Sequence, residues 1–148
     1  MSNSYTFFAP GKPAPQGSKK VHRYIKGRAI LGESSAAVDP WRKVIAGCAR
    51  RLQPEQWHAK LPVSLTLTFV FARPKAHFRA NGKLKGSAPQ HCVTRIGDLD
   101  KLCRAVCDAL TGIAYDDDSQ VFSLHAVRRY AVGSESHGAH ITITDRKS

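Results

Sequence analysis

Acidic residues are scarce in this chain, which has 11 Asp and Glu against 23 Lys and Arg in 148 residues, a formal net charge of +12. Long apolar runs are absent: nothing approaches the roughly 20 residues that span a bilayer, and residues 5–9 are too short for a signal peptide. We therefore expect a cytoplasmic protein. The hydrophobic fraction of 42% argues against wholesale disorder, and the length favours one domain over residues 1–148.

The familiar cysteine patterns of metal sites are missing as well. The four cysteines include no CxxC pair, and in a cytoplasmic chain they are expected to be reduced. Cys103 and Cys107 have a spacing compatible with zinc on a helix, although both also fit its small-residue face. His137 and His140 form a lone HxxH, which is weak evidence for a metal. Neither pair indicates a nucleophilic Cys/His arrangement.

The few acids are concentrated in one segment. Six of the eleven lie within residues 98–118, the acidic segment, which holds only two basic residues; its net charge is −4, and the rest of the chain carries +16. Such a basic excess usually indicates a polyanionic partner. A protein that only grips phosphate has no use for the acidic segment, whereas an enzyme that cuts phosphodiesters needs carboxylates to hold a divalent metal ion.

Hydrophobic periodicity predicts an α/β (α+β) fold in which two helices pack on one mixed sheet, in the order β-α-β-α-β-β. The expected elements are a strand at 5–9, a helix with Asp39 as N-cap, Pro40 at its first helical position and Pro54 after its end, a strand at 63–71, a helix at about 99–111 stopped by Gly112, and a hairpin of strands 119–132 and 139–144. The expected core-facing residues are Trp41, Val44, Ile45, Cys48 and Leu52, then Val63, Leu65, Leu67, Phe69 and Phe71, then Leu99, Cys103, Val106 and Leu110.

Two long basic segments separate these elements, at about 11–35 and 73–97. The first is expected to be a loop or an irregular hairpin. Loops of this length are uncommon unless they are functional or disordered. The second offers Phe78 as a stacking side chain and is either a phosphate-tracking loop or merely a solvated one.

The acidic segment contains a candidate metal site. If Asp98 is the extended N-cap of the second helix and Asp100 lies in its first turn, both carboxylates can face one point, although capping alone would explain either residue. The helix then advances about 15 Å, a distance that residues 111–118 can retrace, so Asp118 can return beside them. Three converging carboxylates repel unless a cation bridges them, and Mg²⁺ is the hard, oxygen-seeking choice.

The acidic run 116–118 leaves open which of its acids returns beside Asp98 and Asp100, and Arg104 has two possible roles. In strand geometry Asp116 would share a face with Asp118, and Asp117 would oppose them. Arg104 lies one helical turn after Asp100, where it makes a surface ion pair or holds the scissile phosphate.

The segment DLDKLCRAVCDALTGIAYDDDSQV, residues 98–121, resembles the signature of the RusA family of Holliday-junction resolvases, small Mg²⁺-dependent endonucleases frequent in phages and prophages. The segments GKPAPQGSKK (11–20), RPKAH (73–77) and SAP (87–89) are also similar to segments of that family. The resemblance covers most of the chain. It implies a homodimer that binds four-way junctions and nicks two strands symmetrically.

The resemblance also assigns residues. The family's catalytic acids fall on Asp98, Asp100 and Asp118, which would hold the metal, and its catalytic lysine falls on Arg104, which keeps the charge but cannot donate a proton as lysine might. Gly97 stands where the family commonly has proline or a basic residue, a change that we interpret as loosening the approach to the site. Asp117 matches a neighbouring acid of secondary importance.

These observations predict a structure-selective endodeoxyribonuclease of recombination and repair that uses Mg²⁺, with Mn²⁺ as a substitute. The expected DNA contacts, which read shape through the phosphates, are Lys19, Lys20, Arg23, Lys75, Arg79, Lys83, Lys85 and Lys101, the last of which could also be merely solvated. The alternatives are a non-catalytic protein that binds branched DNA, and a nuclease that debranches forks or flaps during phage DNA processing.

Overall fold

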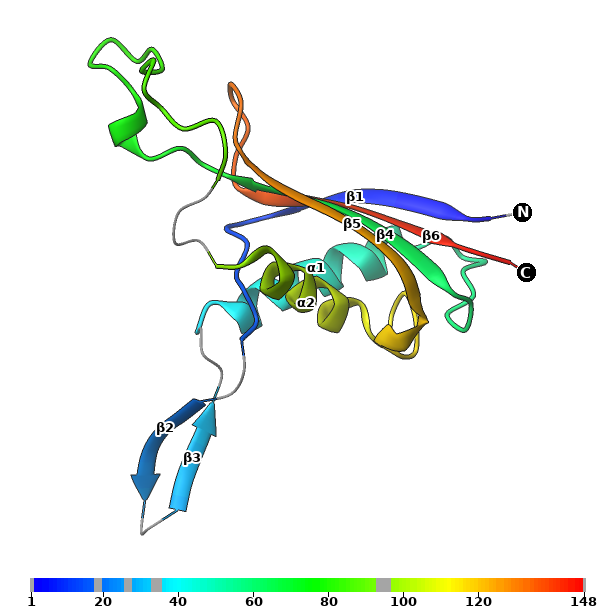
Figure 1. Ribbon diagram of the computed structural model, residues 1–148. Helices are drawn as coiled ribbons and strands as arrows, with labels where there is room; N and C mark the ends of the chain where they lie inside the picture. Colours follow the sequence, from blue (N-terminus) through cyan, green and yellow to red (C-terminus); the bar gives the residue numbers. More distant parts are fainter. Residues whose placement is uncertain (1, 18–19, 26–27, 33–35, 93–96, 148) are drawn as a thin grey trace.

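The computed structural model describes residues 2–17, 20–25, 28–32, 36–92 and 97–147, and within 20–32 it describes the backbone only. The elements follow in the order β1 (Ser4–Pro10), β2 (Lys20–Ile25), β3 (Arg28–Gly32), α1 (Val38–Leu52), β4 (Val63–Phe71), η1 (Lys75–His77), α2 (Leu99–Leu110), η2 (Asp118–Gln120), β5 (Val121–Tyr130) and β6 (Gly138–Asp145) (Figure 1). In the part of the chain described, no helix is long and apolar enough to cross a membrane.

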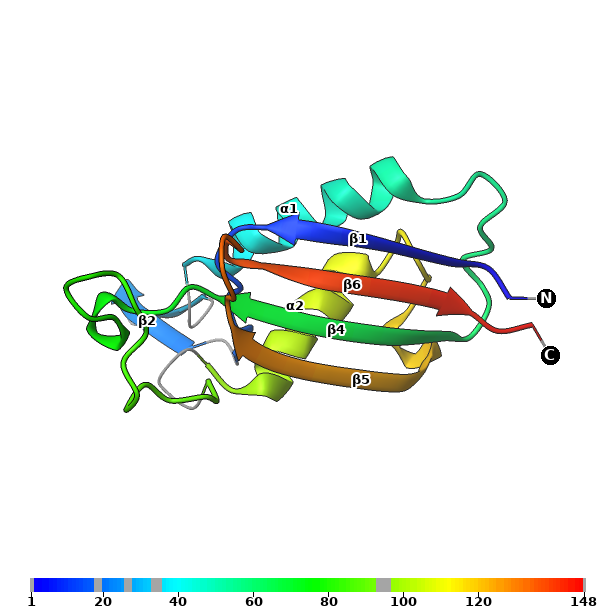
Figure 2. The same ribbon diagram turned by 90° about the horizontal axis from the view of Figure 1, so that it is seen from above.

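A mixed sheet in the order β1-β6-β4-β5 forms the body, and both helices cover one of its faces (Figure 2). The α+β prediction and its element order are confirmed. β4 pairs antiparallel with β6 and parallel with β5. Parallel neighbours need a crossover connection, and α2 lies in the connection between β4 and β5. The predicted hairpin of β5 and β6 is wrong, because β6 lies between β1 and β4 and β5 occupies the edge.

The core lies between the sheet and the helices. The alternating face of β4 is buried as predicted, and so are Trp41, Ile45 and Cys48 of α1. Val44 and Leu52 were predicted to face the core but are 36% and 48% exposed, because the buried side of α1 is narrower than its apolar stripe. The N-cap of α1 is Ala37 rather than Asp39, whose carboxylate instead pairs with Arg42 one turn later.

The two basic segments contain ordered elements. In the first segment, β2 and β3 form an antiparallel pair with a register shift, which confirms the irregular hairpin. The two strands project from the body (Figure 1). The second begins with η1 and continues as a narrow hairpin over residues 77–85. Positive charge is therefore carried by two protruding structures.

Candidate active site

The exposed face of α2 carries a row of ionisable side chains. Asp100, Arg104 and Asp108 are spaced by four residues and so share one face, while the opposite face is buried. Asp98 is the N-cap, with extended backbone at φ −74° and ψ 148°, but its side chain makes no capping hydrogen bond. Its carboxylate instead lies 3.5 Å from Lys101 Nζ. Helix capping therefore does not engage the Asp98 carboxylate.

Gly97 fixes the approach to Asp98. Its φ of +97° strains any other residue, and a Cβ there would lie 2.7 Å from Cβ of Pro15. The Gly97 carbonyl also accepts a hydrogen bond from the Arg128 guanidinium on β5. The interpretation that glycine loosens this approach is therefore wrong, since the backbone is held from both sides.

The segment after α2 returns along the helix. Gly112, with φ +84°, ends the helix as predicted, and its N–H donates to the Tyr115 carbonyl at 2.7 Å. The buried Tyr115 hydroxyl donates to the Cys107 carbonyl at 2.7 Å. Trp57 Nε1 donates to the Ala114 carbonyl at 2.8 Å. These bonds hold the acidic run 116–118 beside the second half of α2.

The Gln120 side chain joins the backbone of the acidic run to the loop before β4. Its Oε1 accepts from the backbone N–H groups of Asp116 and Asp117, at 2.9 and 3.0 Å. Its Nε2 donates to the carbonyls of Ala59 and Leu61 in the loop before β4. Asp117 caps η2, accepting from Ser119 N–H at 2.9 Å. The predicted strand geometry of this run is wrong, because residues 118–120 form a 3₁₀ turn and the strand begins at Val121.

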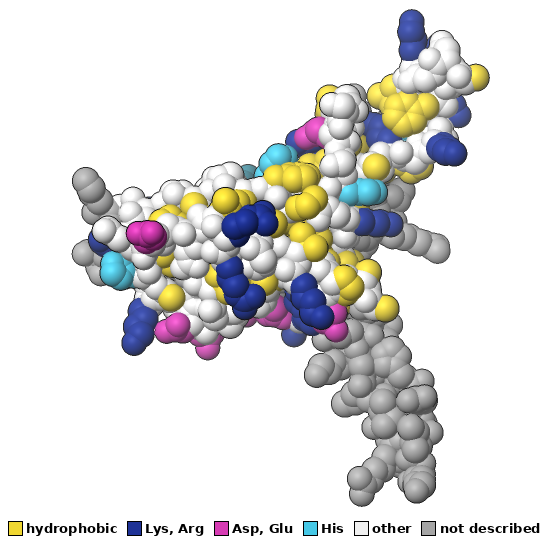
Figure 3. All heavy atoms as spheres, turned by 180° about the vertical axis from the view of Figure 1, so that it is seen from behind, with side chains coloured by type: hydrophobic (Ala, Val, Ile, Leu, Met, Phe, Trp, Pro, Cys, Tyr) yellow, Lys and Arg dark blue, Asp and Glu magenta, His cyan; other side chains and the backbone are white. Residues whose placement is uncertain are grey.

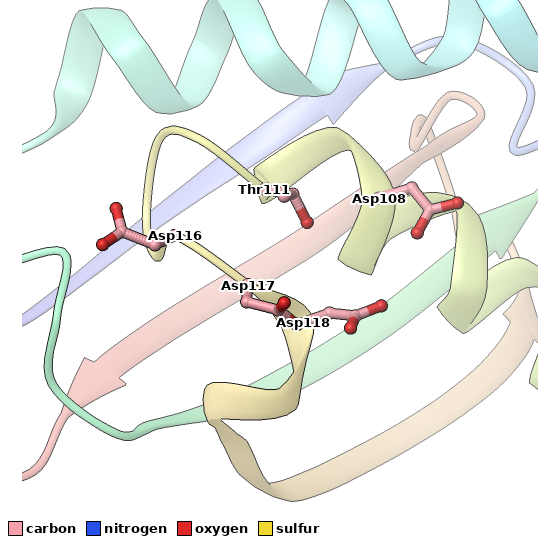
Figure 4. Close-up of a pocket in the computed structure, with 5 residues that line it drawn as sticks. All are labelled: Asp108, Thr111, Asp116, Asp117 and Asp118. Atoms are coloured by element: carbon pink, nitrogen blue, oxygen red, sulfur yellow. The ribbon is translucent and has the colours of Figure 1, made fainter.

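Asp118 is the acid of the run that turns toward α2, whereas Asp116 points away from it (Figure 4). A shallow open depression of about 340 Å³ is lined by Asp108, Thr111 and the three acids 116–118. Slight desolvation, the adjoining Asp117 carboxyl and Asp108 raise the pKa of the exposed Asp118, while the Arg104 guanidinium acts in the opposite direction. Asp118 therefore lies within the electrostatic reach of the exposed face of α2.

The three predicted metal ligands are not gathered, since Asp98 and Asp100 lie at the start of α2 and Asp118 lies on η2. Among the described residues, no group of three or more His, Cys, Asp or Glu side chains is close enough to hold a metal ion. Within the described residues, Cys103 and Cys107 therefore have no third ligand with which to bind zinc. Burial also raises the pKa of both thiols, which disfavours the thiolate form that binds metals.

The described DNA contacts that the sequence predicts lie on four elements. Lys75 lies in η1, Arg79, Lys83 and Lys85 lie in the 77–85 hairpin, and Lys101 lies on α2. Lys20 and Arg23 are described only as backbone positions of β2, and Lys19 lies outside the described residues.

Two residues of the candidate site were not predicted. Asp108 lies in the depression on the same helix face as Asp100 and Arg104, and its eight-residue spacing from Asp100 was an available signal. Gln16 is only 8% exposed and donates from Nε2 to the Asp108 carboxylate. Nothing in the local pattern around Gln16 indicates this contact, since the two residues lie 92 positions apart.

Residues 10–144 match the sequence profile of the family described as Endodeoxyribonuclease RusA. The chain belongs to the RusA family. RusA proteins are hydrolytic endodeoxyribonucleases that resolve Holliday junctions, so the acids of α2 and η2 lie in a nuclease whose substrate is branched DNA. No curated protein gave a match to the chain.

Proposed function

We propose that this RusA protein resolves four-way DNA junctions by paired, symmetric nicks as a homodimer. In this proposal Asp98, Asp100 and Asp118 hold Mg²⁺, for which Mn²⁺ can substitute, and Arg104 contacts the scissile phosphate. The observation that carries the proposal is the position of Asp118 beside α2, where the charge of Arg104 reaches it. The family supplies the reaction and the class of substrate.

The donor set fits a hard divalent cation. Asp98 and Asp118 are exposed carboxylates, Asp98 makes no capping bond, and Asp118 is raised in pKa partly by neighbouring acids whose repulsion a cation would relieve. The chemistry that a bound divalent cation supplies is activation of water and polarisation of the phosphate. Arg104 is exposed on the same helix face as Asp100, where its guanidinium can bind a phosphate through two N–H donors.

Dimerisation is supported by the exposed edge of the sheet. Within the described strands, β5 has a partner on one side only, and Phe122, Leu124 and Val127 on it are 54%, 47% and 41% exposed. Edge strands with exposed apolar side chains are prone to pair with another chain, and a second copy provides the two-fold symmetry that suits a four-way junction. We expect Leu124→Lys to shift the protein toward monomer in sedimentation, while Leu52→Lys, at a similarly exposed site on α1, does not.

The deciding experiment is cleavage of a labelled, immobile four-way junction and of a linear duplex of the same sequence, each with Mg²⁺ and with EDTA. We expect paired nicks in the junction alone, and only with Mg²⁺. Asp98→Asn should abolish the nicks and leave junction binding in a mobility-shift assay unchanged. The exposed-site control Glu55→Gln should alter neither cleavage nor binding.

Other outcomes would contradict the proposal. Tight junction binding without nicks, in Mg²⁺ or Mn²⁺, would favour a non-catalytic binding protein. Faster cleavage of three-armed forks or flaps than of four-way junctions would favour a debranching nuclease. Full cleavage by Asp98→Asn would remove that residue from the site.

A further inference from the structure

The second basic segment contains a defined hairpin rather than an open loop. Across residues 77–85, Arg79 N–H donates to the Lys83 carbonyl at 2.7 Å and Lys85 N–H donates to the His77 carbonyl at 2.9 Å. The turn is closed by Gly82, whose φ is +83°, and by Asn81, whose side chain accepts from Lys83 N–H at 3.0 Å. The tip therefore presents its side chains in a definite arrangement.

Phe78 and Leu84 form an apolar pair on this hairpin. They face each other in an antiparallel bridge between the two hydrogen-bonded pairs, which is the position that brings facing side chains closest. Phe78 is 38% exposed and Leu84 is 47% exposed. Neither belongs to the hydrophobic core. Packing of this domain thus does not account for the pair.

The charged residues around the pair are all basic. Residues 73–97 contain no Asp or Glu, and Arg79 and Lys83 adjoin the pair in the hairpin. Figure 3 shows hydrophobic side chains with basic ones around them on the protruding tip at its upper right. A partner with exposed apolar surface inside a field of negative charge fits this combination. An unstacked nucleobase of branched DNA has both properties, since its flat face is apolar and its backbone is anionic.

The base of the hairpin is anchored to the end of β5. The Arg73 guanidinium lies 4.6 Å from the centre of the Tyr130 ring, and the His77 ring packs edge-on against it at 5.2 Å between centroids. Arg73 also donates to the Pro89 carbonyl at 2.8 Å, which joins the two ends of the protruding segment. β5 carries Arg128, which holds Gly97 next to Asp98. The hairpin and the acidic site are thus connected through one strand.

We propose that Phe78 and Leu84 form a wedge that stacks on unpaired bases at the branch point of the DNA substrate. This inference rests on the proposed function, because only branched DNA offers unstacked bases at the site of cleavage. The surrounding Lys and Arg residues bind the phosphates on either side, while the apolar pair replaces the lost base stacking. Phe78 and Leu84 thereby select branched DNA over linear duplex.

The test is performed in EDTA, so that binding is measured without cleavage. The probes are a four-way junction and a linear duplex, each with 2-aminopurine either at the central base pairs or ten pairs into an arm. Wild-type protein should change the fluorescence of the central probe in the junction only. Phe78→Ala should weaken junction binding by about tenfold and abolish that change, with duplex binding unaltered. Leu84→Ala should act in the same direction.

Matched variants separate stacking from charge and from folding. Phe78→Trp should restore both the fluorescence change and the affinity. Val132→Ala removes an apolar side chain that is 72% exposed in the β5–β6 connection and should alter neither quantity. Lys83→Ala should weaken junction and duplex binding alike. Thermal unfolding of each variant should match the wild type, because the replaced side chains lie outside the core.

Each result decides the proposal. Equal losses on junction and duplex for Phe78→Ala, or no loss at all, would overturn the wedge and leave a phosphate-binding loop. The wild type could bind junctions without cutting them, while Phe78→Ala shows the expected loss of junction affinity. That pair of results would contradict the proposed nuclease activity and support the wedge. A wild-type protein that does not distinguish junction from duplex would overturn both.

Discussion

Gln16 donates a hydrogen bond from Nε2 to Oδ2 of Asp108, and it joins the N-terminal motif to the acid-bearing helix. Its backbone N–H also donates to the Lys101 carbonyl at 3.0 Å, and its Oε1 accepts from Arg42 on α1. One buried amide therefore links α1, α2 and the segment that leads into β2.

Replacement of this amide should cost stability. Gln16→Ala leaves the Asp108 carboxylate without that donor, and we expect the free energy of unfolding to fall by about 1–3 kcal/mol, measured by urea denaturation. Gln56→Ala, at an exposed position in the loop before β4, serves as control. Equal denaturation midpoints for the two variants would contradict a structural role for this link.

Gly97→Ala should lower both stability and cleavage. The positive φ and the close approach of Pro15 together are expected to cost about 2–4 kcal/mol, and the strain falls directly before Asp98. Gly86→Ala is the matched control, since a Cβ at Gly86 meets nothing within 4 Å. We would measure melting temperature and junction cleavage for both. Normal cleavage by Gly97→Ala would mean that the position of Asp98 tolerates movement.

The acidic run allows a comparison of neighbouring residues. Asp118→Asn should reduce junction cleavage by about 10²-fold or more without weakening DNA binding, because a metal ligand contributes several kcal/mol to the transition state. Asp116→Asn should leave the rate within about twofold, since Asp116 points away from α2. Single-turnover cleavage distinguishes the two, and the reverse order of effects would assign the site to Asp116.

The contribution of the Arg104 side chain to cleavage can be tested by removing its charge and by keeping the charge on a different side chain. We expect Arg104→Ala to slow cleavage by about 10²-fold, because a donor to the developing phosphate charge is lost. Arg104→Lys, which keeps the positive charge, should recover most of the rate. Arg50→Ala on the exposed face of α1 controls for loss of positive charge. A wild-type rate for Arg104→Ala would reduce Arg104 to a surface ion pair.

Glu135 makes the connection between β5 and β6 sensitive to acid. Its carboxylate accepts from both terminal nitrogens of Arg129, at 2.7 and 2.8 Å, and from Val132 N–H at 2.7 Å. These bonds lower the pKa of Glu135 from 4.5 to about 2. A lowered pKa stabilises the fold above the unfolded-state pKa, and that stabilisation disappears as pH falls through the folded-state value.

Glu135→Gln should therefore melt below the wild type at pH 7, and the difference should shrink between about pH 4.5 and pH 2. Melting temperatures at pH 7, 4, 3 and 2 test this expectation, with Glu55→Gln as the exposed control. A difference that stays constant across this range would show that the carboxylate charge contributes nothing.

The fold class was predictable because apolar periodicity is a local property. The alternation of β4 and the stripe of α2 both appear in the sequence within windows of about ten residues. Both are buried in the structure, apart from Leu99, which is only partly buried. Strand pairing was not predictable in the same way. The chain brings β6 between β1 and β4, and no local feature of residues 138–145 states which strands will be its neighbours.

The candidate site shows the same division. The sequence by itself determined the family, the concentration of acids in residues 98–118 and the placement of Asp98 at the start of α2, because these depend on residue type and short-range spacing. Only the tertiary structure decided that Gln120 binds the backbone of the acidic run, that Asp118 rather than Asp116 points toward the helix, and that Gln16 contacts Asp108. These contacts join residues brought together by the packing of α1, α2 and the sheet, and such long-range packing leaves no periodic signal in the sequence.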